Sequence, residues 1–277
     1  MSSPQNAGSA GSYSARVVAF VDILGFADLV KRADRNPSLR EAIIDALRNV
    51  RSFASPTDSD TDLRAQNFSD SLIVSAVNTP DGLWHLALSL DSLAWNLLNL
   101  GLLVRGAITI GGVHQDDEIV FGVGVNEAYQ LESKIARFPR IIFSRSALSA
   151  ADKWGREDEI WKTYHDSRLR RGQDGVWHLN ILTEMGCFSR QQNSPGVQQH
   201  PFFAQGELMH GIIQSMLDQA VEQPEVYSKV EWFARYWNDE VATSPSNGQP
   251  TIVGRVRLAG EEEGGPTLPF RAHGAGG

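Results

Sequence analysis

An apolar run broken by one acid, VVAFVDIL at residues 17–24, places the strongest constraint on the fold of this chain. A short, continuous run of β-branched and apolar residues is typical of a strand that is buried on both faces of a sheet. Asp22 lies inside the run. An ionised carboxylate in such a place costs several kcal/mol unless it is paired or binds a metal ion. The run therefore predicts a covered strand with a charged partner or a cation beside Asp22.

Hydrophobic periodicity divides the body of the chain, about residues 16–241, into alternating strands and helices. The expected elements, in chain order, are a strand at 16–24, a helix at 28–53 with a break at Asn36-Pro37, strands at 63–68 and 71–77, a helix at 81–100, a strand at 101–113, a short strand near 119–121, a helix from Val125 to about Phe138 and a strand at 139–144. This βαββαβ order, followed by a further helix and strand, predicts an α/β (α+β) sandwich with a central antiparallel hairpin.

The two ends of the chain differ from the body in composition. Residues 1–15 are mostly Ser, Gly, Ala and Asn, and residues 243–277 are rich in Gly and Pro, so disordered tails are expected at both. Within the second tail, 251–258 alternates enough to form an edge strand. Between body and tail, apolar stripes at 207–221 and 230–237 predict a helical extension over 191–242 that packs on the sheet.

The charge balance excludes several classes of partner. Lys plus Arg number 25 against 33 Asp plus Glu, which gives a net charge of −8. Cationic surface provides most of the binding to nucleic acid and to anionic membranes, so neither is expected as a partner. The single cysteine, Cys187, allows neither an intramolecular disulfide nor a zinc-thiolate site. Without a spanning apolar segment or a signal peptide, the chain is expected to be cytoplasmic.

A second acid, Asp70 in NFSDSLIVS, lies near the turn between the two closely spaced strands. In a βαββαβ sheet this hairpin is the neighbour of the first strand, so Asp22 and Asp70 are expected to meet at one edge of the sheet. Two carboxylates with no Lys or Arg nearby in sequence suit Mg²⁺ or Mn²⁺. Taken singly, Asp22 can instead cap the following helix, and Asp70 can be an ordinary turn residue.

Four segments, in this order and spacing, resemble the catalytic core of the class III nucleotide cyclases: FVDILGF (20–26), FSDSLIV (68–74), RGAITIGG (105–112) and FGVGVNEAYQLES (121–133). The wording of the last two is most similar to the pyrimidine cyclases of Pycsar antiphage defence. The resemblance spans about residues 17–144 and makes residues 16–190 a cyclase catalytic domain. It implies conversion of UTP to 3′,5′-cyclic UMP and pyrophosphate, a signal that a separate effector protein would read.

The resemblance also implies a set of site residues. In the family, the positions of Asp22 and Asp70, with the backbone carbonyl of Ile23, hold two Mn²⁺ or Mg²⁺ ions per active site. The backbone N–H groups of Leu24, Gly25 and Phe26 would bind the triphosphate. For Gly25 the alternative is a simple turn from strand to helix. The family works as a head-to-tail homodimer, with each site completed across the interface.

The helix after GVGVN departs from the family pattern. Asn126 matches the asparagine that orients the ribose, but Gln130 stands where the family has an arginine that neutralises the phosphate. A neutral amide cannot replace a guanidinium at a developing charge. At helical spacing Asn126, Gln130, Lys134 and Arg137 share one face, so Lys134 or Arg137 is expected to supply the cation. The alternative is that both belong to a solvated charged face.

Two positions bear on the choice of base. Adenylate cyclases of the family carry an adenine-reading Lys and Asp where this chain has Gln66 and Ile119, so ATP is not the expected substrate. A Gln amide suits uracil and, in the flipped orientation, cytosine; UTP is favoured, and CTP is the alternative. Because of Gln130, a non-catalytic nucleotide sensor on the same fold is a second alternative. A diguanylate-type or polymerase palm domain is a third, but the chain lacks its hairpin signature.

Overall fold

The acid-bearing run forms β1 (Ser14–Leu24), the strand around which the sheet is built. The computed structural model describes residues 13–52, 60–183, 201–242 and 255–259. Antiparallel partners lie on both sides of β1, namely β3 (Ser71–Val77) and β4 (Leu103–Gln115). Val17, Val18 and Val21 are completely buried. The predicted two-sided burial of this strand is therefore confirmed.

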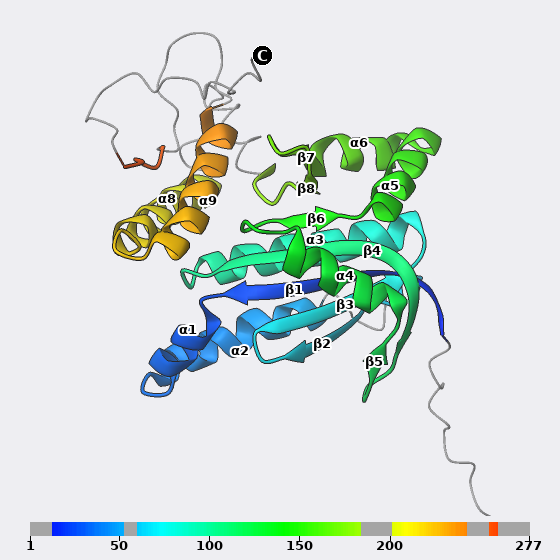
Figure 1. The fold of residues 1–277 in the computed structure, drawn as a ribbon, viewed down its shortest axis with the longest axis horizontal. Helices are drawn as coiled ribbons and strands as arrows, with labels where there is room; N and C mark the ends of the chain where they lie inside the picture. The colour runs from blue at the N-terminus through cyan, green and yellow to red at the C-terminus, as the bar shows by residue number, and fades with distance from the viewer. Residues whose placement is uncertain (1–12, 53–59, 184–200, 243–254, 260–277) are drawn as a thin grey trace, which may run out of the picture.

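The other strands extend the sheet outward in the order β2-β3-β1-β4-β6-β8-β7, with β5 paired to β4 (Figure 1). They are β2 (Arg64–Phe68), β5 (Val120–Phe121), β6 (Ile141–Phe143), β7 (Leu169–Arg171) and β8 (Trp177–Leu179). The β4–β6 pair is parallel, and the other described pairs are antiparallel. The predicted βαββαβ order and central hairpin are confirmed.

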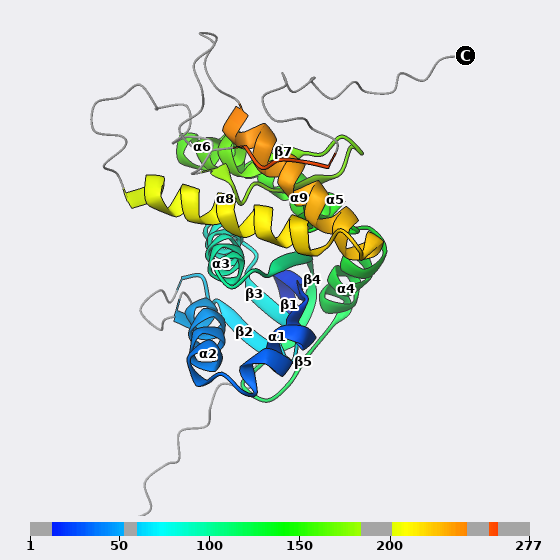
Figure 2. The same cartoon turned by 90° about the vertical axis from the view of Figure 1, so that its left-hand side faces the viewer.

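Helices cover both faces of this sheet, with α3 on one face and α4 on the other (Figure 2). The described helices are α1 (Phe26–Ala33), α2 (Pro37–Ser52), α3 (Pro80–Leu98), α4 (Val123–Lys134), α5 (Arg145–Glu157), α6 (Glu159–Arg168), α8 (Pro201–Gln219) and α9 (Pro224–Ala242). None of them is both long and apolar enough to cross a bilayer. The predicted C-terminal helices are confirmed as α8 and α9, and Trp232 of α9 contacts His178 of β8.

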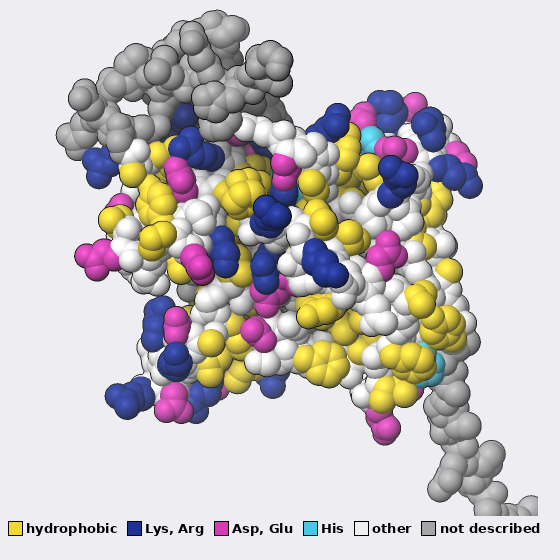
Figure 3. All heavy atoms as spheres, viewed as in Figure 1, with side chains coloured by type: hydrophobic (Ala, Val, Ile, Leu, Met, Phe, Trp, Pro, Cys, Tyr) yellow, Lys and Arg dark blue, Asp and Glu magenta, His cyan; other side chains and the backbone are white. Residues whose placement is uncertain are grey.

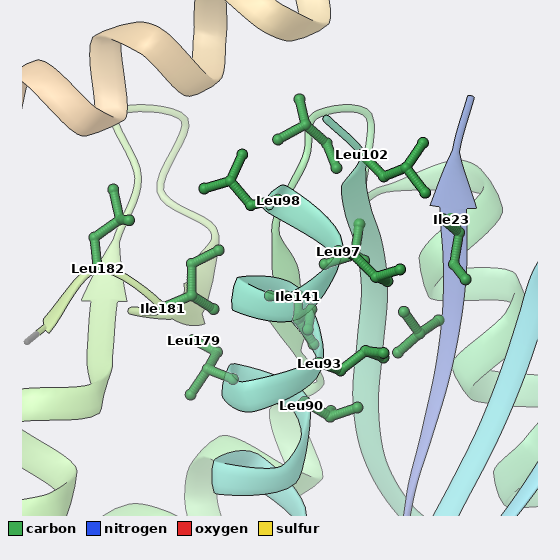
Figure 4. Close-up of a cluster of buried hydrophobic side chains, with 14 of the residues drawn as sticks. Ile23, Leu90, Leu93, Leu97, Leu98, Leu102, Ile141, Leu179, Ile181 and Leu182 are labelled. Carbon is green, nitrogen blue, oxygen red and sulfur yellow. The ribbon is translucent and has the colours of Figure 1, made fainter. Parts of the chain in front are cut away.

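The main core is built around α3. Its start is fixed by Thr79, whose hydroxyl accepts the N–H of Gly82 at 3.1 Å, with Pro80 at the first helical position. A leucine stripe then points into the core, where Leu90, Leu93 and Leu97 lie between Ile23 of β1 and the leucines near β8 (Figure 4). Because β1 sends alternate side chains to opposite faces, this packing turns Asp22 toward α4.

Some predicted boundaries differ from the structure. The expected helix at 28–53 begins two residues earlier; its predicted break at Asn36-Pro37 is confirmed, because Asn36 accepts the N–H of Leu39 and starts α2. The helix expected to reach about Phe138 ends at Lys134. There the N–H groups of Ile135 and Ala136 both bond to the carbonyl of Leu131, which closes the last turn.

The expected edge strand at 251–258 falls partly outside the described residues, which exclude 251–254. The described remainder, 255–258, belongs to no strand. Side chains of α8 and α9 bond to the backbone of Val256 and Arg257.

Candidate functional site

Asp22 lies near the end of β1 on the face that α4 covers. The strand register sets it opposite Ser71 of β3 and Arg105 of β4. Its side chain is 19% exposed, so it is shielded by the neighbouring elements but reachable from solvent. The sheet thus places a carboxylate where β1 gives way to α1.

Asp70 lies in the two-residue turn that joins β2 to β3, directly beside this end of β1. The backbone N–H of Ile23 donates to the carbonyl of Asp70 at 2.8 Å. Ser69, the other turn residue, has φ +55°, in the left-handed region that a tight hairpin turn uses. The backbones of Asp22, Ile23 and Asp70 therefore come together, as the order of elements leads one to expect.

Asp22 has a charged partner that sequence reasoning missed. The Nε atom of Arg105 lies 3.2 Å from Oδ2 of Asp22 and 2.6 Å from Oε1 of Glu132 on α4. The side chain of Glu132 is only 3% exposed, and this burial raises its pKa; the Asp22 charge adds to the rise and Arg105 opposes it. A signal was present, because Arg105 is a lone charge in an apolar strand, as Asp22 is.

The chain turns sharply from β1 into α1 at Gly25. Gly25 has φ +81°, a left-handed conformation that glycine adopts at little cost. No side chain caps the N-terminus of α1, so the N–H groups of its first turn are not occupied by a cap. These groups lie immediately beyond Asp22 and Ile23. Of the three residues expected to bind the triphosphate, Phe26 begins α1 and Gly25 is its N-cap, whereas Leu24 is the last residue of β1 and pairs with β4.

The two positions expected to read the base also come together. The amide Nε2 of Gln66, on β2, donates to the carbonyl of Glu118 at 3.3 Å, and the next residue, Ile119, is 52% exposed. Gln66 pairs with Ile73, which pairs with Phe20, so Gln66 is on the Asp22 face of the sheet. Within the described residues, the buried Oε1 atom of Gln66 has no hydrogen-bond partner. It is an acceptor without a donor.

The expected residues of α4 are divided by the end of the helix. Asn126, Gln130 and Lys134 are exposed on α4, but Arg137 lies beyond it. The expectation that Arg137 shares their face is therefore wrong, because Pro139 disfavours helical backbone at the residue before it and the last turn closes at Leu131. Of the two candidate cations, Lys134 remains on the face of Asn126.

A close backbone contact holds α4 on the sheet. A Cβ atom built on Gly111 of β4 would lie 2.7 Å from the Cα of Gly124 in α4, nearer than real side chains come. The two glycines therefore allow the N-terminal turn of α4 to touch β4 directly. Asn126, two residues further along the same turn, is positioned by this contact.

The donors at this end of the sheet suit a divalent cation that arrives with a nucleotide. In the described ranges, no three His, Cys, Asp or Glu side chains are grouped to hold a metal ion. The carboxylates of Asp22 and Asp70 and the carbonyl of Ile23 are oxygen donors of the kind that Mg²⁺ and Mn²⁺ prefer. Mg²⁺ commonly takes one or two carboxylates and completes its shell with water and substrate phosphates. The residues present therefore fit such an ion.

Large apolar side chains are exposed around the same face. Figure 3 shows apolar atoms gathered on the surface over α4 and β5. Tyr13 and Phe121 form a ring contact at 6.2 Å, and the N–H of Val123 lies 3.3 Å from the Tyr13 hydroxyl oxygen. This apolar rim consists of Tyr13, Phe68, Ile119, Phe121, Val123 and Tyr129, each about half exposed or more.

No family model and no curated protein matches this chain. Among solved structures, it is similar to the adenylyl cyclase CyaB from P. aeruginosa, with 18% identity and a TM-score of 0.40 over 51% of this chain and 83% of that one. The guanylyl cyclase Cya2 shares 16% identity with a TM-score of 0.37, over 61% of this chain and 93% of that one. A class III adenylyl cyclase-like ATP-binding protein from Pseudomonas aeruginosa shares 14% identity with a TM-score of 0.35, over 54% of this chain and 39% of that one. Likenesses of this extent assign no activity.

Proposed function

We propose that this protein is a nucleotide cyclase, which joins the 3′-oxygen of a nucleoside triphosphate to its own α-phosphorus and releases pyrophosphate. The observation that supports this most directly is the 2.8 Å bond from the Ile23 N–H to the Asp70 carbonyl. It puts a turn acid beside a strand acid, just before the uncapped start of α1. Oxygen donors for a cation and N–H donors for phosphates then lie at one place.

Each residue at this end of the sheet has a role in that reaction. Asp22, Asp70 and the Ile23 carbonyl would hold two Mn²⁺ or Mg²⁺ ions. Ions bound there supply Lewis-acid activation of the 3′-hydroxyl and neutralise charge on the phosphates. The N–H groups of Leu24, Gly25 and Phe26 bind the triphosphate.

Arg105 is the cation that the geometry offers for the phosphates. It lies beside Asp22. Gln130, at the position of the family's arginine, brings no charge. In the reaction the new bond joins O3′ to the α-phosphorus, and the bond from that phosphorus to the β-phosphate oxygen breaks. The proton of the 3′-hydroxyl goes to solvent, and pyrophosphate is the leaving group.

We favour UTP as the substrate, with Gln66 as the residue that would read the base. Because its Nε2 is bonded to the Glu118 carbonyl, its Oε1 is left to accept a hydrogen bond. The N3–H of uracil and the 4-amino group of cytosine are both such donors, so this atom fits either pyrimidine. The product would be cyclic UMP, with CTP and cyclic CMP as the alternative. The resemblance to the Pycsar cyclases supports a role as an antiphage signal, read by a separate effector protein.

The exposed face of α4 supports a head-to-tail homodimer. Asn126 and Lys134 are exposed there, beside the apolar rim. Contiguous exposed apolar surface is typical of an interaction site. In the proposed dimer the rim is covered by a second copy, and Asn126 and Lys134 of one protomer reach the nucleotide held at Asp22 of the other.

A specific observation favours a second candidate, a nucleotide-binding protein without turnover. Gln130 is neutral, and Arg105 is already engaged by Asp22 and Glu132. A protein with no cation released to the phosphates would bind a nucleotide without stabilising the transition state.

An assay with each of the four nucleoside triphosphates and Mn²⁺ separates these candidates. We expect pyrophosphate and a cyclic product from UTP, and a loss of at least about 100-fold in Asp22→Ala and in Asp70→Ala, because each removes a cation ligand. Asp45→Ala, an exposed acid on α2, is the matched control and should keep full activity. Product from CTP alone would support the alternative base, and binding without product the second candidate. Turnover that survives both active-site changes would contradict the proposal.

A further inference from the structure

The helices α8 and α9 hold a short extended segment of the chain, residues 255–259, which is drawn in red beside them in Figure 2. Exposure along it alternates: Val256 and Leu258 are 1% and 6% exposed, whereas Arg255, Arg257 and Ala259 are exposed. Alternation with a period of two is what a strand shows when one face is covered. Here the cover is a pair of helices and not a sheet.

Two side-chain amides bond the backbone of this segment reciprocally. Nδ2 of Asn238 donates to the Val256 carbonyl at 2.8 Å, and the Val256 N–H donates to Oδ1 of Asn238 at 2.8 Å. Gln214 does the same to Arg257, accepting its N–H at 2.8 Å and donating to its carbonyl at 3.3 Å. Each amide therefore takes the place of one peptide group of a neighbouring strand.

The arrangement has the parts of a built recognition site. Asn238 is on α9 and only 2% exposed, and Gln214 is on α8, so the two helices contribute one clamp each. His210, also on α8, places Nε2 3.0 Å from the Arg255 carbonyl oxygen. Backbone bonds of this kind give affinity in strand-addition complexes, and pockets for alternate side chains give specificity. A buried amide such as Asn238 needs the peptide to satisfy it.

We propose that α8 and α9 form a peptide-binding site for an extended segment with apolar side chains at alternate positions, and that residues 255–258 of this chain are its built-in occupant. The site lies outside the nucleotide site and does not depend on the proposed cyclase activity. Its clamps bind backbone, and the two apolar positions contribute to the choice of sequence. A separate peptide of the same pattern can therefore replace the segment when the segment is removed.

The first test opens the site in the full-length chain with the double change Val256→Asp and Leu258→Asp. A labelled peptide of residues 251–261 should bind this variant saturably and at least 10-fold more tightly than it binds the unchanged chain, whose site is filled. The same peptide carrying both aspartates should not bind. A folded variant, as judged by its helical circular dichroism, that does not take the peptide would overturn the proposal.

The second test leaves both apolar residues in place and uses two glutamines of α8. Gln214→Ala removes a clamp, whereas Gln219→Ala removes an amide that bonds only to Ser215 among its described contacts. Hydrogen exchange at the Arg257 amide should become at least 10-fold faster in Gln214→Ala and stay unchanged in Gln219→Ala. An Arg257 amide that exchanges at the same rate in both variants would also overturn the proposal, whatever the fold of the opened variant.

Discussion

Two lone charges in neighbouring apolar strands meet in this fold. Asp22 and Arg105 stand opposite each other in the β1–β4 register, and the Arg105 guanidinium continues to Glu132. Of the three, Glu132 is the most deeply buried. A buried carboxylate with one cation depends on that cation, because the remaining charge is not compensated when the partner is removed.

Removing the Arg105 guanidinium should therefore be costly. We expect Arg105→Ala to lower the free energy of unfolding by about 3 kcal/mol, because Glu132 would stay buried without its cation. Replacing both, as Arg105→Met with Glu132→Leu, should recover most of the loss. Urea unfolding measures all three proteins.

The exposed Arg137 offers a matched control for that experiment. Arg137→Ala should change the free energy of unfolding by less than about 0.5 kcal/mol, as surface changes usually do. If Arg105→Ala is as mild as this control, then Glu132 does not rely on Arg105.

At the residue scale, the sequence predicted that Asp22 and Asp70 would lie at one edge of the sheet, but not that Arg105 would pair with Asp22. The approach of Asp22 to Asp70 follows from the order of elements alone, since a hairpin beside β1 brings its turn to the end of that strand. The contact of Asp22 with Arg105 follows from the register of β1 against β4, two strands separated by three helices and a hairpin. Alternation within each strand does not define a register between them.

Among the elements, α4 is the one whose placement matters most to the site. Its N-terminal turn touches β4 at Gly111 and Gly124, and its exposed side presents Asn126 and Lys134. A shift of this helix would move both side chains and Glu132 together.

Adding a methyl group at this contact should push α4 away from the sheet. We expect Gly111→Ala to lower the free energy of unfolding by about 1 to 3 kcal/mol, as overpacking does. Gly211→Ala, in α8, is the matched control, because a Cβ there meets nothing within 4 Å. That change should stabilise the protein by about 0.5 to 1 kcal/mol, since alanine favours a helix over glycine. A neutral Gly111→Ala variant would show that the contact tolerates a side chain.

The end of α4 shows why its boundary was predicted poorly. Apolar periodicity continues to Phe138, but Phe138 stacks on Trp232 of α9, with ring centroids 5.4 Å apart and an angle of 6°. The Arg140 guanidinium also lies over the Trp232 ring, 5.4 Å from its centroid. These contacts come from a helix that follows almost a hundred residues later, so no local pattern reports them.

For the molecule as a whole, His178 of β8 marks the junction between the C-terminal helices and the sheet. Its ring contacts Trp232 and Tyr236 of α9 at 5.9 and 5.4 Å between centroids. Burial lowers the pKa of His178 to about 4; the charges of Arg140 and Arg170 add to the shift, while the Leu179 carbonyl opposes it. The folded protein therefore holds this imidazole neutral.

The free energy of unfolding should decrease as the pH is lowered, because of His178. The unfolded chain takes a proton at His178 near pH 6.5, whereas the folded chain resists it down to about pH 4. The contribution is thus complete above pH 6.5 and is lost as the pH falls through this window, by up to about 3 kcal/mol. In unfolding measurements from pH 4 to 7, His178→Asn should lack this part of the pH dependence. Parallel curves for the two proteins would contradict the assignment.

The proposed homodimer predicts that two inactive variants restore each other. Asp22→Ala and Asn126→Ala each disable both sites of a symmetric dimer. In an equal mixture, about half of the dimers contain one of each chain and one intact site, so about a quarter of the activity should return. The matched mixture of Asp22→Ala with Asp70→Ala should stay inactive, since both changes fall in the same half-site. Failure of the first mixture to recover activity, with chain exchange shown by labelled protomers, would place the whole site within one chain.

The central position of β1 has a consequence for biosynthesis. This strand leaves the ribosome before its partner β4, which is complete only at Gln115. At ordinary rates of translation the apolar run waits roughly 5 to 20 s for that partner. During this interval the nascent chain exposes a strand rich in valine. Asp22 is the one acid within this strand, and its charge disfavours association of the strand with the same segment of neighbouring nascent chains on a polysome.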